Sequence, residues 1–368
     1  MKNSINTLEV KNFKSIKHVN IDCKRINLFI GKPNVGKSNI LEAISLFDAP
    51  VCNPSRPFLS EFMRFEKASN LFYDQDRKNI IHVNTNIGCA ALRFHLNQIN
   101  QYDICFGPSK EFVSTFHSES TEGDLTQISG KYRSLASAHK YQPGGTSVDP
   151  FYASFSDEMN NFNSYSSASK TTFVPVKRYI FKSLEKQENN FPLFLRPPFG
   201  DNLYTIIESN PRLYEEIAHF FREYELDLLI DTASNKLEVQ KRVGNRVYKI
   251  PYSLAADTLQ RIIFHLAAIK TNKDSVLLFE EPEAHSYPPY VSMLGDTIIE
   301  DKFNQYFVAT HSHYLLTSFI EQCEPPDISI FITTYENYET KIRALTNAEV
   351  ENIMETGIDF FFNTSAFQ

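Results

Sequence analysis

The feature that most constrains this chain is a glycine-bounded motif near its N-terminus. The segment Gly31–Ser38 reads GKPNVGKS and matches the pattern G-x-x-x-x-G-K-[ST]. It follows an apolar run at Ile26–Ile30, interrupted only by Asn27, which is typical of a strand buried on both faces. It precedes Ser38–Phe47, where apolar residues recur at helical spacing. Because the motif binds phosphate in this order of strand, loop and helix, we predict an α/β fold with a nucleotide site.

Each fixed position of this motif has a physical role in holding a triphosphate. Gly31 and Gly36 let the backbone turn tightly, so that successive N–H groups point inward around phosphate oxygens. We expect Lys37 to bridge the β- and γ-phosphates and the Ser38 hydroxyl to ligate Mg²⁺. The alternative is a glycine turn that only caps a helix, but a chance match in a chain of this length is expected roughly 1% of the time at average composition. The predicted contacts to ATP are Gly31, Lys32, Pro33, Asn34, Val35, Gly36, Lys37, Ser38 and Asn39.

A second apolar run leads directly into a pair of carboxylates. Ser275–His285 reads SVLLFEEPEAH, and its acids Glu280 and Glu281 follow four apolar residues. A buried strand that ends in acids places them at the carboxyl edge of a parallel sheet, beside the phosphate loop. We expect Glu280 to hold Mg²⁺ together with Ser38, and Glu281 to polarise the attacking water. Taken alone, such acids more often belong to a solvated loop or a helix cap, and the phosphate loop in the same chain is what favours the catalytic interpretation.

A third run, Tyr306–Leu316, again ends in polar residues and reads YFVATHSHYLL. We expect its His311 to contact the γ-phosphate or the attacking water, which makes Lys37, Glu281 and His311 the predicted catalytic residues. A lone histidine at such a place is more often the neighbour of a helix cap. Within the same motif His313 is the competing choice, and we rank it below His311.

A fourth motif, Pro251–Ile269, lies just upstream of the acidic strand and reads PYSLAADTLQRIIFHLAAI. Ser253 and Asp257 lie near the predicted start of its helix. Because a helix N-terminus carries partial positive charge, these two residues are expected to contact the γ-phosphate of a nucleotide held by another subunit. The alternative is an ordinary capped helix of the core.

Composition narrows the class of protein further. The chain has 368 residues, 42% of them hydrophobic, which is enough to bury a core and excludes a disordered chain. Its N-terminus lacks the apolar core of a signal peptide, and no apolar run is long enough to span a membrane. Five scattered cysteines without a CxxC pair argue against a zinc ribbon or a disulfide framework and favour a reducing cytoplasm. A net charge of −7 excludes coating of nucleic acid by bulk charge, although a local basic patch remains allowed.

The periodicity of the chain predicts one domain over residues 1–368 with two inserted regions. Alternating runs between about 70 and 106 predict an antiparallel β-meander. With the serine- and glycine-rich stretch that follows, this meander forms an insertion over residues 51–172, and a helical insertion is expected within residues 182–222. The other predicted elements are strands at Asn6–Val10, Val19–Asp22, Phe173–Tyr179, Val276–Phe279 and Tyr306–Ala309, helices at Asp257–Ile269 and Tyr290–Ile299, and a hairpin that turns at Gly244-Asn245.

In this order and spacing, the four motifs resemble the ABC-type ATPase heads of the RecF/SMC-related group. They look most like a stand-alone AAA family ATPase of the OLD type, found in bacterial defence and repair proteins. The opening LEVKNFKSIKHVNI, with Phe13 and Lys14, is similar to the leading strands of that group. The resemblance covers residues 1–50 and about 173–320 well, and the insertion at 51–172 poorly. It implies a P-loop NTPase head of the ABC type with an antiparallel β side layer and an inserted helical lobe.

The resemblance also assigns roles to residues. It implies that Ser253–Arg261 is the signature helix and that Arg178, in FVPVKRY, matches an arginine of the family. Related proteins with a fused nuclease carry a Toprim domain after the switch histidine, and the 57 residues that follow His311 are too few for it. The remaining implied roles are Walker A at Gly31–Ser38, a Walker B strand ending at Glu280, a catalytic glutamate at Glu281 and a switch histidine at His311.

Three departures from the family pattern stand out. Glu280 takes the place where most relatives have aspartate, and its longer side chain alters the expected metal geometry. The signature SLAADTLQR lacks its usual glycine, which puts the contact across the dimer in question. The glutamine of the Q-loop is not placed by the sequence, and Gln187 is the candidate.

Two classes of function are compatible with these residues. In the first, an ATPase forms a homodimer around two ATP molecules, and hydrolysis opens it, as a switch for an effector such as a nuclease or toxin in DNA repair or anti-phage defence. In the second, the chain is a nucleotide-gated scaffold or sensor with little turnover; the Glu280-Glu281 pair favours the first. DNA is a candidate partner, because five cations near the N-terminus would make a groove, although a solvated strand edge is the alternative. These cations are Lys11, Lys14, Lys17, Lys24 and Arg25.

Overall fold

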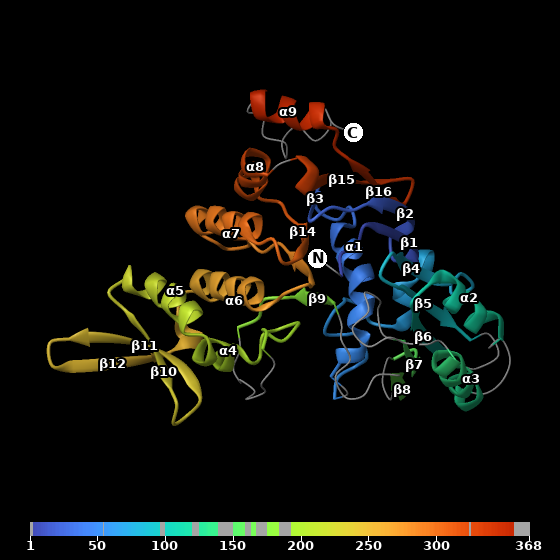
Figure 1. Ribbon diagram of the computed structural model, residues 1–368, viewed down its shortest axis with the longest axis horizontal. Coiled ribbons are helices and arrows are strands. Elements are labelled where there is room, and N and C mark those ends of the chain that lie inside the picture. Colours follow the sequence, from blue (N-terminus) through green and yellow to red (C-terminus); the bar gives the residue numbers. More distant parts are fainter. Residues whose placement is uncertain are drawn as a thin grey trace.

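The computed structural model describes residues 3–53, 55–95, 100–119, 125–138, 150–158, 163–166, 175–183, 193–323 and 325–356. In these ranges two large β-sheets lie side by side, with helix α1 (Lys37–Ile44) between them (Figure 1). Three further helices, α6 (Asp257–Thr271), α7 (Pro288–Glu300) and α8 (His313–Gln322), stack on the opposite face of the sheet that carries β3. The predicted α/β class with an antiparallel side layer is confirmed.

The six-stranded sheet holds the buried apolar runs of the sequence. Its strands are β3 (Ile26–Ile30), β9 (Val176–Tyr179), β13 (Val276–Glu280), β14 (Gln305–Ala309), β15 (Ile328–Glu336) and β16 (Glu339–Ala344). They lie in the order β16-β15-β3-β14-β13-β9, and every pairing is parallel except that of β16 with β15. Both β3 and β14 are buried throughout, as continuous apolar runs predict. Asn27 within β3 is satisfied because its amide donates to the Tyr306 carbonyl at 3.1 Å.

The seven-stranded sheet is antiparallel and forms the side layer. Its strands are β1 (Thr7–Phe13), β2 (Ile16–Asp22), β4 (Ile81–Thr85), β5 (Cys89–Phe94), β6 (Gln101–Gly107), β7 (Phe151–Ser156) and β8 (Asn163–Ser166). The meander expected between 70 and 106 is present as β4, β5 and β6, and β4 pairs directly with β1. Helices α2 (Lys110–Glu119) and α3 (Leu125–Ala138) cover its outer face. The division of the chain into a domain with two insertions stays a prediction.

Helix α1 is fixed from both sides by apolar contacts. Its Ile40, Leu41 and Ile44 belong to one buried cluster with side chains of both sheets. Burying a side chain of this size contributes roughly 1.5–3 kcal/mol. The helix therefore cannot shift without losing contacts to both layers, and this fixes the start of the helix where the phosphate loop ends.

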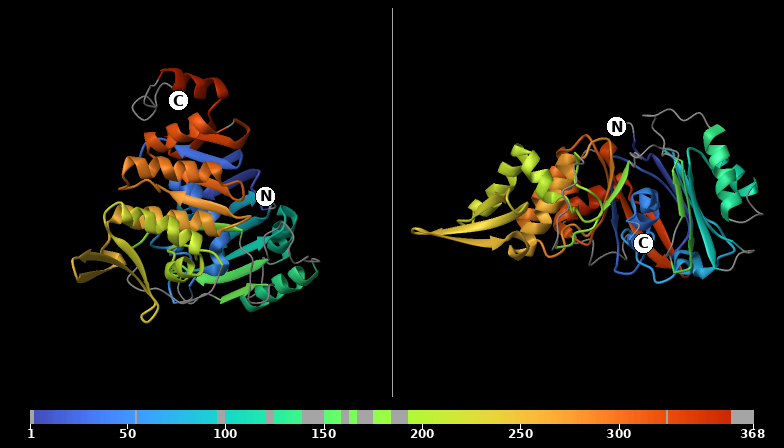
Figure 2. Two further views of the ribbon diagram at one scale, coloured as in Figure 1. Left: turned by 60° about the vertical axis from the view of Figure 1, so that its left-hand side comes forward. Right: turned by 90° about the horizontal axis from the view of Figure 1, so that it is seen from below.

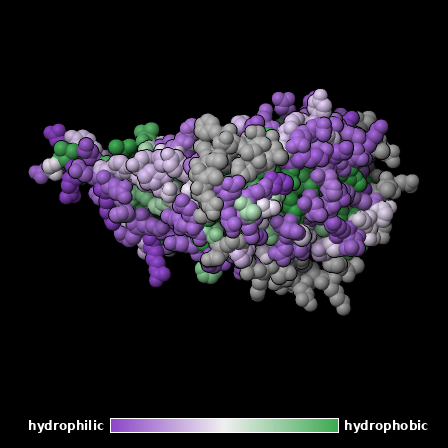
Figure 3. All heavy atoms as spheres, turned by 90° about the horizontal axis from the view of Figure 1, so that it is seen from above, coloured by the Kyte–Doolittle hydropathy of each residue, from purple (hydrophilic) through white to green (hydrophobic). Residues whose placement is uncertain are grey.

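The helical lobe and a three-stranded sheet project from the other side of the molecule (Figures 1 and 2). The predicted helical stretch is divided into α4 (Leu203–Ser209) and α5 (Pro211–Arg222), because Pro211 starts a new helix and the Asn210 side chain caps it by accepting from Leu213 N at 3.2 Å. The sheet consists of β10 (Asp227–Asp231), β11 (Lys236–Val243) and β12 (Arg246–Pro251). The β11–β12 hairpin forms the tip at the left of Figure 3. No helix in the described part of the chain is long and apolar enough to cross a membrane.

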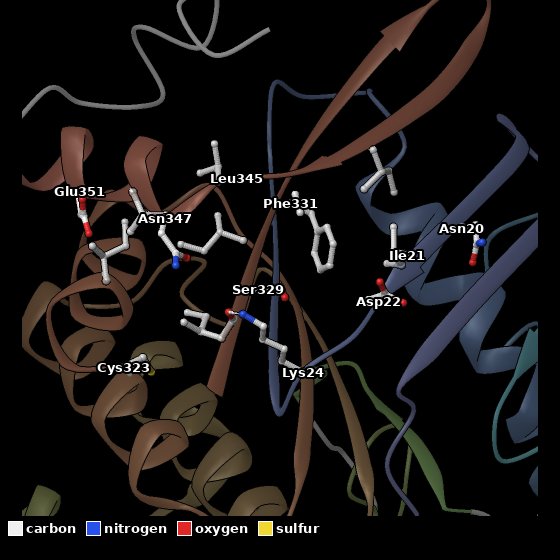
Figure 4. A pocket seen from close by; sticks show the side chains of 16 residues that line it. Asn20, Ile21, Asp22, Lys24, Cys323, Ser329, Phe331, Leu345, Asn347 and Glu351 are labelled. Carbon is white, nitrogen blue, oxygen red and sulfur yellow. Dashed lines mark hydrogen bonds between the residues drawn. The ribbon is translucent and has the colours of Figure 1, made fainter. Parts of the chain in front are cut away.

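The C-terminal region adds elements that the sequence did not predict, namely β15, β16 and α9 (Asn347–Thr356). Short 3-10 helices complete the described fold at Ser45–Val51, Ala68–Leu71, Tyr73–Gln75, Tyr252–Leu254 and Pro325–Asp327. A cavity of about 600 Å³ lies between β2, α8, β15, β16 and α9 (Figure 4). Its lining includes Asp22, Lys24 and Cys323 and none of the residues of the predicted nucleotide site.

Candidate nucleotide site

The carboxyl ends of four parallel strands meet at one edge of the six-stranded sheet. Ala309 of β14 pairs with Phe29 of β3 on one side and with Glu280 of β13 on the other. Phe279 of β13 pairs in turn with Tyr179 at the end of β9. The phosphate loop, the histidine motif and the acidic pair follow these strands and therefore lie side by side. Motifs that are far apart in the chain are brought together at this edge.

The phosphate loop adopts backbone angles that favour glycine. Its φ angles are 147° at Gly31, 66° at Asn34 and 98° at Gly36, all in the left-handed half of the map. The Lys37 ammonium donates to the carbonyl oxygens of Gly31 at 2.9 Å and of Lys32 at 2.8 Å. The lysine thus lies inside its own loop. Burial lowers the pKa of Lys37 to about 8, although nearby carboxylates, with Glu281 the strongest, act in the opposite direction.

Strand β16 supports this loop from outside the sequence motif. The Thr340 hydroxyl donates to the Val35 carbonyl at 2.9 Å and lies 2.6 Å from the Ser15 hydroxyl. The Asn39 amide donates to the same Ser15 hydroxyl at 2.7 Å, so this predicted contact to ATP faces the β1–β2 turn. A Cβ atom added at Gly36 would lie 2.1 Å from the Thr340 hydroxyl oxygen. The glycine is therefore required by space as well as by its φ angle.

We expect Gly36→Ala to lower the free energy of unfolding by about 1–3 kcal/mol, because the methyl group overlaps Thr340 and alanine is strained at this φ. Urea denaturation of the variant measures this loss. In the double variant with Thr340→Ala, the overlap with Thr340 is removed, while the backbone strain and a 2.8 Å approach to the Ser15 hydroxyl remain. The double variant should therefore lose less stability than the sum of the losses in the two single variants. Fully additive losses would contradict the contact.

The predicted metal ligands Ser38 and Glu280 touch each other. The Ser38 hydroxyl donates to Oε1 of Glu280, and Arg178 contacts the other carboxylate oxygen. Arg64 donates to Oε1 as well, at 2.9 Å. Burial acts to raise the pKa of Glu280, but the charge of Arg178, the hydroxyl of Ser38 and the charge of Arg64 outweigh it and lower this pKa. Glu280 is therefore ionised at neutral pH.

These two side chains fit a magnesium ion that also takes phosphate oxygens. The hydroxyl of Ser38 and the carboxylate of Glu280 are oxygen ligands, which this hard cation prefers, and they converge on one point. Within the described ranges, no group of three or more His, Cys, Asp and Glu side chains could hold a metal ion. An ion at this position would thus depend on the nucleotide for most of its ligands, as magnesium commonly does.

A buried carboxylate on α1 extends this cluster, and the sequence analysis missed it. The side chain of Glu42 is fully buried and contacts three cations: Lys14, Arg64 at 3.3 Å and Arg178 at 3.8 Å. The side chain of Arg178 is only 2% exposed, whereas that of Arg64 is 72% exposed. Arg178 was found through the family resemblance, but Arg64 and Glu42 lie in segments without any sequence motif.

The second acid of the pair lies next to the histidine. Oε1 of Glu281 is 3.6 Å from Nε2 of His311, and half of the Glu281 side chain is exposed. Burial and the charge of Lys37 lower the pKa of His311, so its imidazole is neutral at neutral pH. His313 is turned to its own helix, where it lies 3.4 Å from Thr317. Of the two candidate histidines, His311 is thus the one beside the acidic pair.

A third acid, Glu283, positions the histidine and was not singled out by the sequence analysis. Its carboxylate accepts from the Thr310 hydroxyl at 2.6 Å and from the His311 backbone N–H at 2.9 Å. Burial raises the pKa of this carboxyl group. The sequence feature that could have pointed to Glu283 is its place as the third glutamate of the segment EEPE. Its contacts hold the end of β14 against the end of β13.

The residues expected to face a second subunit lie at the start of α6. Both Ser253 and Asp257 are exposed, and the carboxylate of Asp257 accepts from Arg261 at 2.7 Å. The neighbouring Leu254 is 72% exposed. Gln187, the candidate Q-loop residue, lies outside the described residues.

Most of the cations expected to form a basic groove near the N-terminus have partners within the chain, and the groove itself stays a prediction. Four of the five are engaged: Lys11 pairs with Glu9, Lys14 with Glu42, Arg25 with Asp327, and the Lys24 ammonium donates to the Ile328 carbonyl. The side chain of Arg25 is 7% exposed. Lys17, on the exposed side of β2, is the cation of the set for which the described residues provide neither an ion pair nor a side-chain hydrogen bond.

Comparisons with known proteins agree with the broad class of this site. Residues 1–142 match the family described as AAA ATPase domain. A protein of Helicobacter pylori (strain ATCC 700392 / 26695) named ATP/GTP phosphatase is 20% identical over 337 residues, which cover 84% of this chain and 85% of that protein. These matches agree with the predicted P-loop fold, and the ATPase activity and the OLD-type subgroup stay predictions.

Solved structures of SMC heads are also similar to the chain. One is a crystal structure of an Smc head bound to the C-terminal winged-helix domain of ScpA. The match covers 95% of this chain and 99% of the Smc head chain, with 14% sequence identity and a TM-score of 0.48. The SMC head domain from Thermotoga maritima matches 93% of this chain and 99% of its own, with 11% identity and a TM-score of 0.40.

Proposed function

We propose that this chain is a magnesium-dependent ATPase. The observation that carries the proposal is the meeting of Ser38 with Glu280 at the edge where Glu281 also lies 3.6 Å from His311. A glycine-bounded loop that holds a lysine, an ionised carboxylate for the metal and a second carboxylate that can accept a proton are the parts that phosphoryl transfer to water requires. The family match of residues 1–142 supports the same activity.

Each side chain has a definite task in this reaction. Lys37 exchanges its bonds to the loop carbonyls for bonds to the β- and γ-phosphates, which its charge stabilises. Ser38 and Glu280 would hold Mg²⁺, which neutralises charge on the same phosphates. Glu281 accepts the proton of the attacking water, and the neutral His311 orients that water or senses the γ-phosphate.

We further propose that two copies enclose two ATP molecules, with the start of α6 facing the nucleotide of the partner copy. The exposure of Ser253, Asp257 and Leu254 supports this role, since a second copy can reach them. ATP would close the dimer and hydrolysis would open it, as a switch for an effector such as a nuclease or a toxin. A place in DNA repair or anti-phage defence follows only from the resemblance to the OLD type.

One observation favours the alternative of a nucleotide-gated scaffold with little turnover. Arg64 donates to the same Glu280 oxygen that contacts Ser38, so it competes with a metal ion for that atom. Measuring phosphate release from ATP and GTP by the purified chain, with and without DNA, separates the two functions. Release that requires Mg²⁺ and is lost in Ser38→Ala supports the ATPase. Negligible release under every condition contradicts it and favours the scaffold.

The affinity for ATP should fall as the pH rises above about 8. The pKa of Lys37 is about 8 in the nucleotide-free chain, and the negative phosphates of bound ATP raise it. Above pH 8, ATP binding is therefore coupled to the uptake of a proton by Lys37, and the affinity for ATP falls by up to about tenfold for each further pH unit. Below pH 8 the lysine is already charged, so Lys37 contributes no pH dependence there. Titration calorimetry at several pH values measures this slope. Lys37→Arg, which stays charged, should lose it, and a constant wild-type affinity above pH 8 would contradict the prediction.

A further inference from the structure

The outer part of the β11–β12 hairpin is a regular element of the described chain whose side chains are exposed on both faces. Every residue from Lys241 to Pro251 is exposed, including the large side chains Val243, Val247 and Tyr248. The two strands pair in register as far as Val243 and Arg246, and Gly244 turns between them with a φ of 59°. From Lys241 onward the hairpin is therefore a regular ribbon that projects into solvent, whereas its base packs on the core through Leu237 and Val239 (Figures 1 and 2).

This ribbon is strongly basic in a chain of net charge −7. The sequence from Lys241 to Lys249, KRVGNRVYK, contains four cations and no carboxylate. Lys249 pairs with Glu238 at 2.8 Å, whereas Lys241, Arg242 and Arg246 make no ion pair with any described residue. In Figure 3, this tip is mostly hydrophilic, with a few hydrophobic residues among the hydrophilic ones. Such a concentration of uncompensated charge favours a polyanionic partner.

The register divides the cations equally between the two faces of the ribbon. Lys241 lies opposite Tyr248, and Arg246 lies opposite Val243, so these four side chains share one face. The other face carries Arg242, opposite Val247, and Lys249, opposite Gln240. Each face thus presents two cations beside larger uncharged side chains, Val243 and Tyr248 on the first face and Val247 on the second, where Lys249 pairs with Glu238. A flat partner such as a membrane or a protein surface contacts one face of a ribbon, whereas a groove with phosphates on both walls contacts both.

We propose that the β11–β12 hairpin is a DNA-binding element that inserts into the major groove of duplex DNA, with its two faces against the phosphates of the two strands. The major groove of B-form DNA is about 12 Å wide and admits a two-stranded β-ribbon. The major groove of duplex RNA is deep and narrow and excludes it. The contacts are made to phosphates, so binding does not depend on base sequence.

The experiment measures the binding of the full chain to a short labelled DNA duplex of mixed sequence by fluorescence anisotropy, without nucleotide. One variant, Lys241→Ala with Arg246→Ala, removes the cations of the first face; the other, Arg242→Ala with Lys249→Ala, removes those of the second. Each should weaken binding at least tenfold. The slope of log K against log salt should fall by about 2 for the first face and by about 1–2 for the second, where Lys249 also pairs with Glu238. The charge-conserving variant Lys241→Arg with Arg246→Lys should bind as the wild type does.

The matched control is Lys11→Ala with Lys17→Ala, which removes the same charge from the opposite lobe and should leave binding unchanged. Equal losses in this control, or a loss confined to one face of the hairpin, would overturn the proposal. Tighter binding to single-stranded DNA, to duplex RNA or to vesicles rich in phosphatidylserine would overturn it as well. Because the assay contains no ATP, its outcome is independent of the proposed ATPase.

Discussion

Glu281→Gln should lower the rate of ATP hydrolysis by about 10²–10⁴-fold, the usual contribution of a general base, and leave the affinity for ATP unchanged. The side chain is half exposed and lies 3.6 Å from a neutral imidazole. An amide keeps the shape of this side chain but cannot accept a proton from water. Single-turnover phosphate release gives the rate, and equilibrium binding of a fluorescent ATP analogue gives the affinity.

The matched control for this variant is Glu321→Gln, which makes the same change at an exposed position on α8 and should keep full activity. Glu280→Gln should differ from both, because it removes charge from the carboxylate that Ser38 contacts, and so raises the Mg²⁺ concentration needed for hydrolysis. Retained hydrolysis in Glu281→Gln would exclude this residue as the base.

Arg178→Met should cause the largest loss of stability of any single change at the site, about 3–5 kcal/mol in the free energy of unfolding. Its side chain is 2% exposed and contacts the carboxylates of Glu280 and of the fully buried Glu42, as well as the Phe62 carbonyl. Methionine fills a similar volume but leaves those groups without their buried cation. Urea denaturation measures the loss.

Arg64→Met tests whether the loss of stability expected for Arg178→Met arises from the burial of Arg178 or only from its contact with the carboxylates. Arg64 contacts the same two carboxylates, at 2.9 Å and 3.3 Å, but its side chain is 72% exposed. Exposed ion pairs contribute about 0–1 kcal/mol, so this variant should lose little stability. Similar losses in the two variants would show that the buried position of Arg178 is not what makes it important.

The arrangement of the candidate nucleotide site could be predicted from the sequence where a strand is followed by a local motif. The apolar runs of β13 and β14 are continuous, and that of β3 is interrupted only by Asn27. Each run leads into residues that the fold brings together: Lys37, Glu280 and His311. Parallel strands place such residues at one edge, so the pattern of the chain was sufficient. The hairpin at Gly244 and the meander were likewise signalled by local periodicity.

The remainder of the site could not be predicted because it depends on contacts between distant segments. Thr340 supports the phosphate loop from a strand that lies 305 residues beyond Val35 in the chain. In the sequence Glu42 is simply a polar residue within a predicted helix, and only the fold shows that it is buried against three cations. The same holds for the cations near the N-terminus: the charge of Lys14 is visible in the sequence, but its partner Glu42 is not.

The most direct measurement is calorimetric titration of the full chain with ATP in the presence of Mg²⁺, alongside Lys37→Ala and a sample without the metal. Because the fold brings the glycine-bounded loop, Ser38 and Glu280 together, the chain should bind one ATP saturably. Removal of Mg²⁺ should weaken this binding, and Lys37→Ala should abolish it. Absence of binding by the wild type, or binding that Lys37→Ala leaves intact, would contradict the assignment of this edge of the sheet as a nucleotide site.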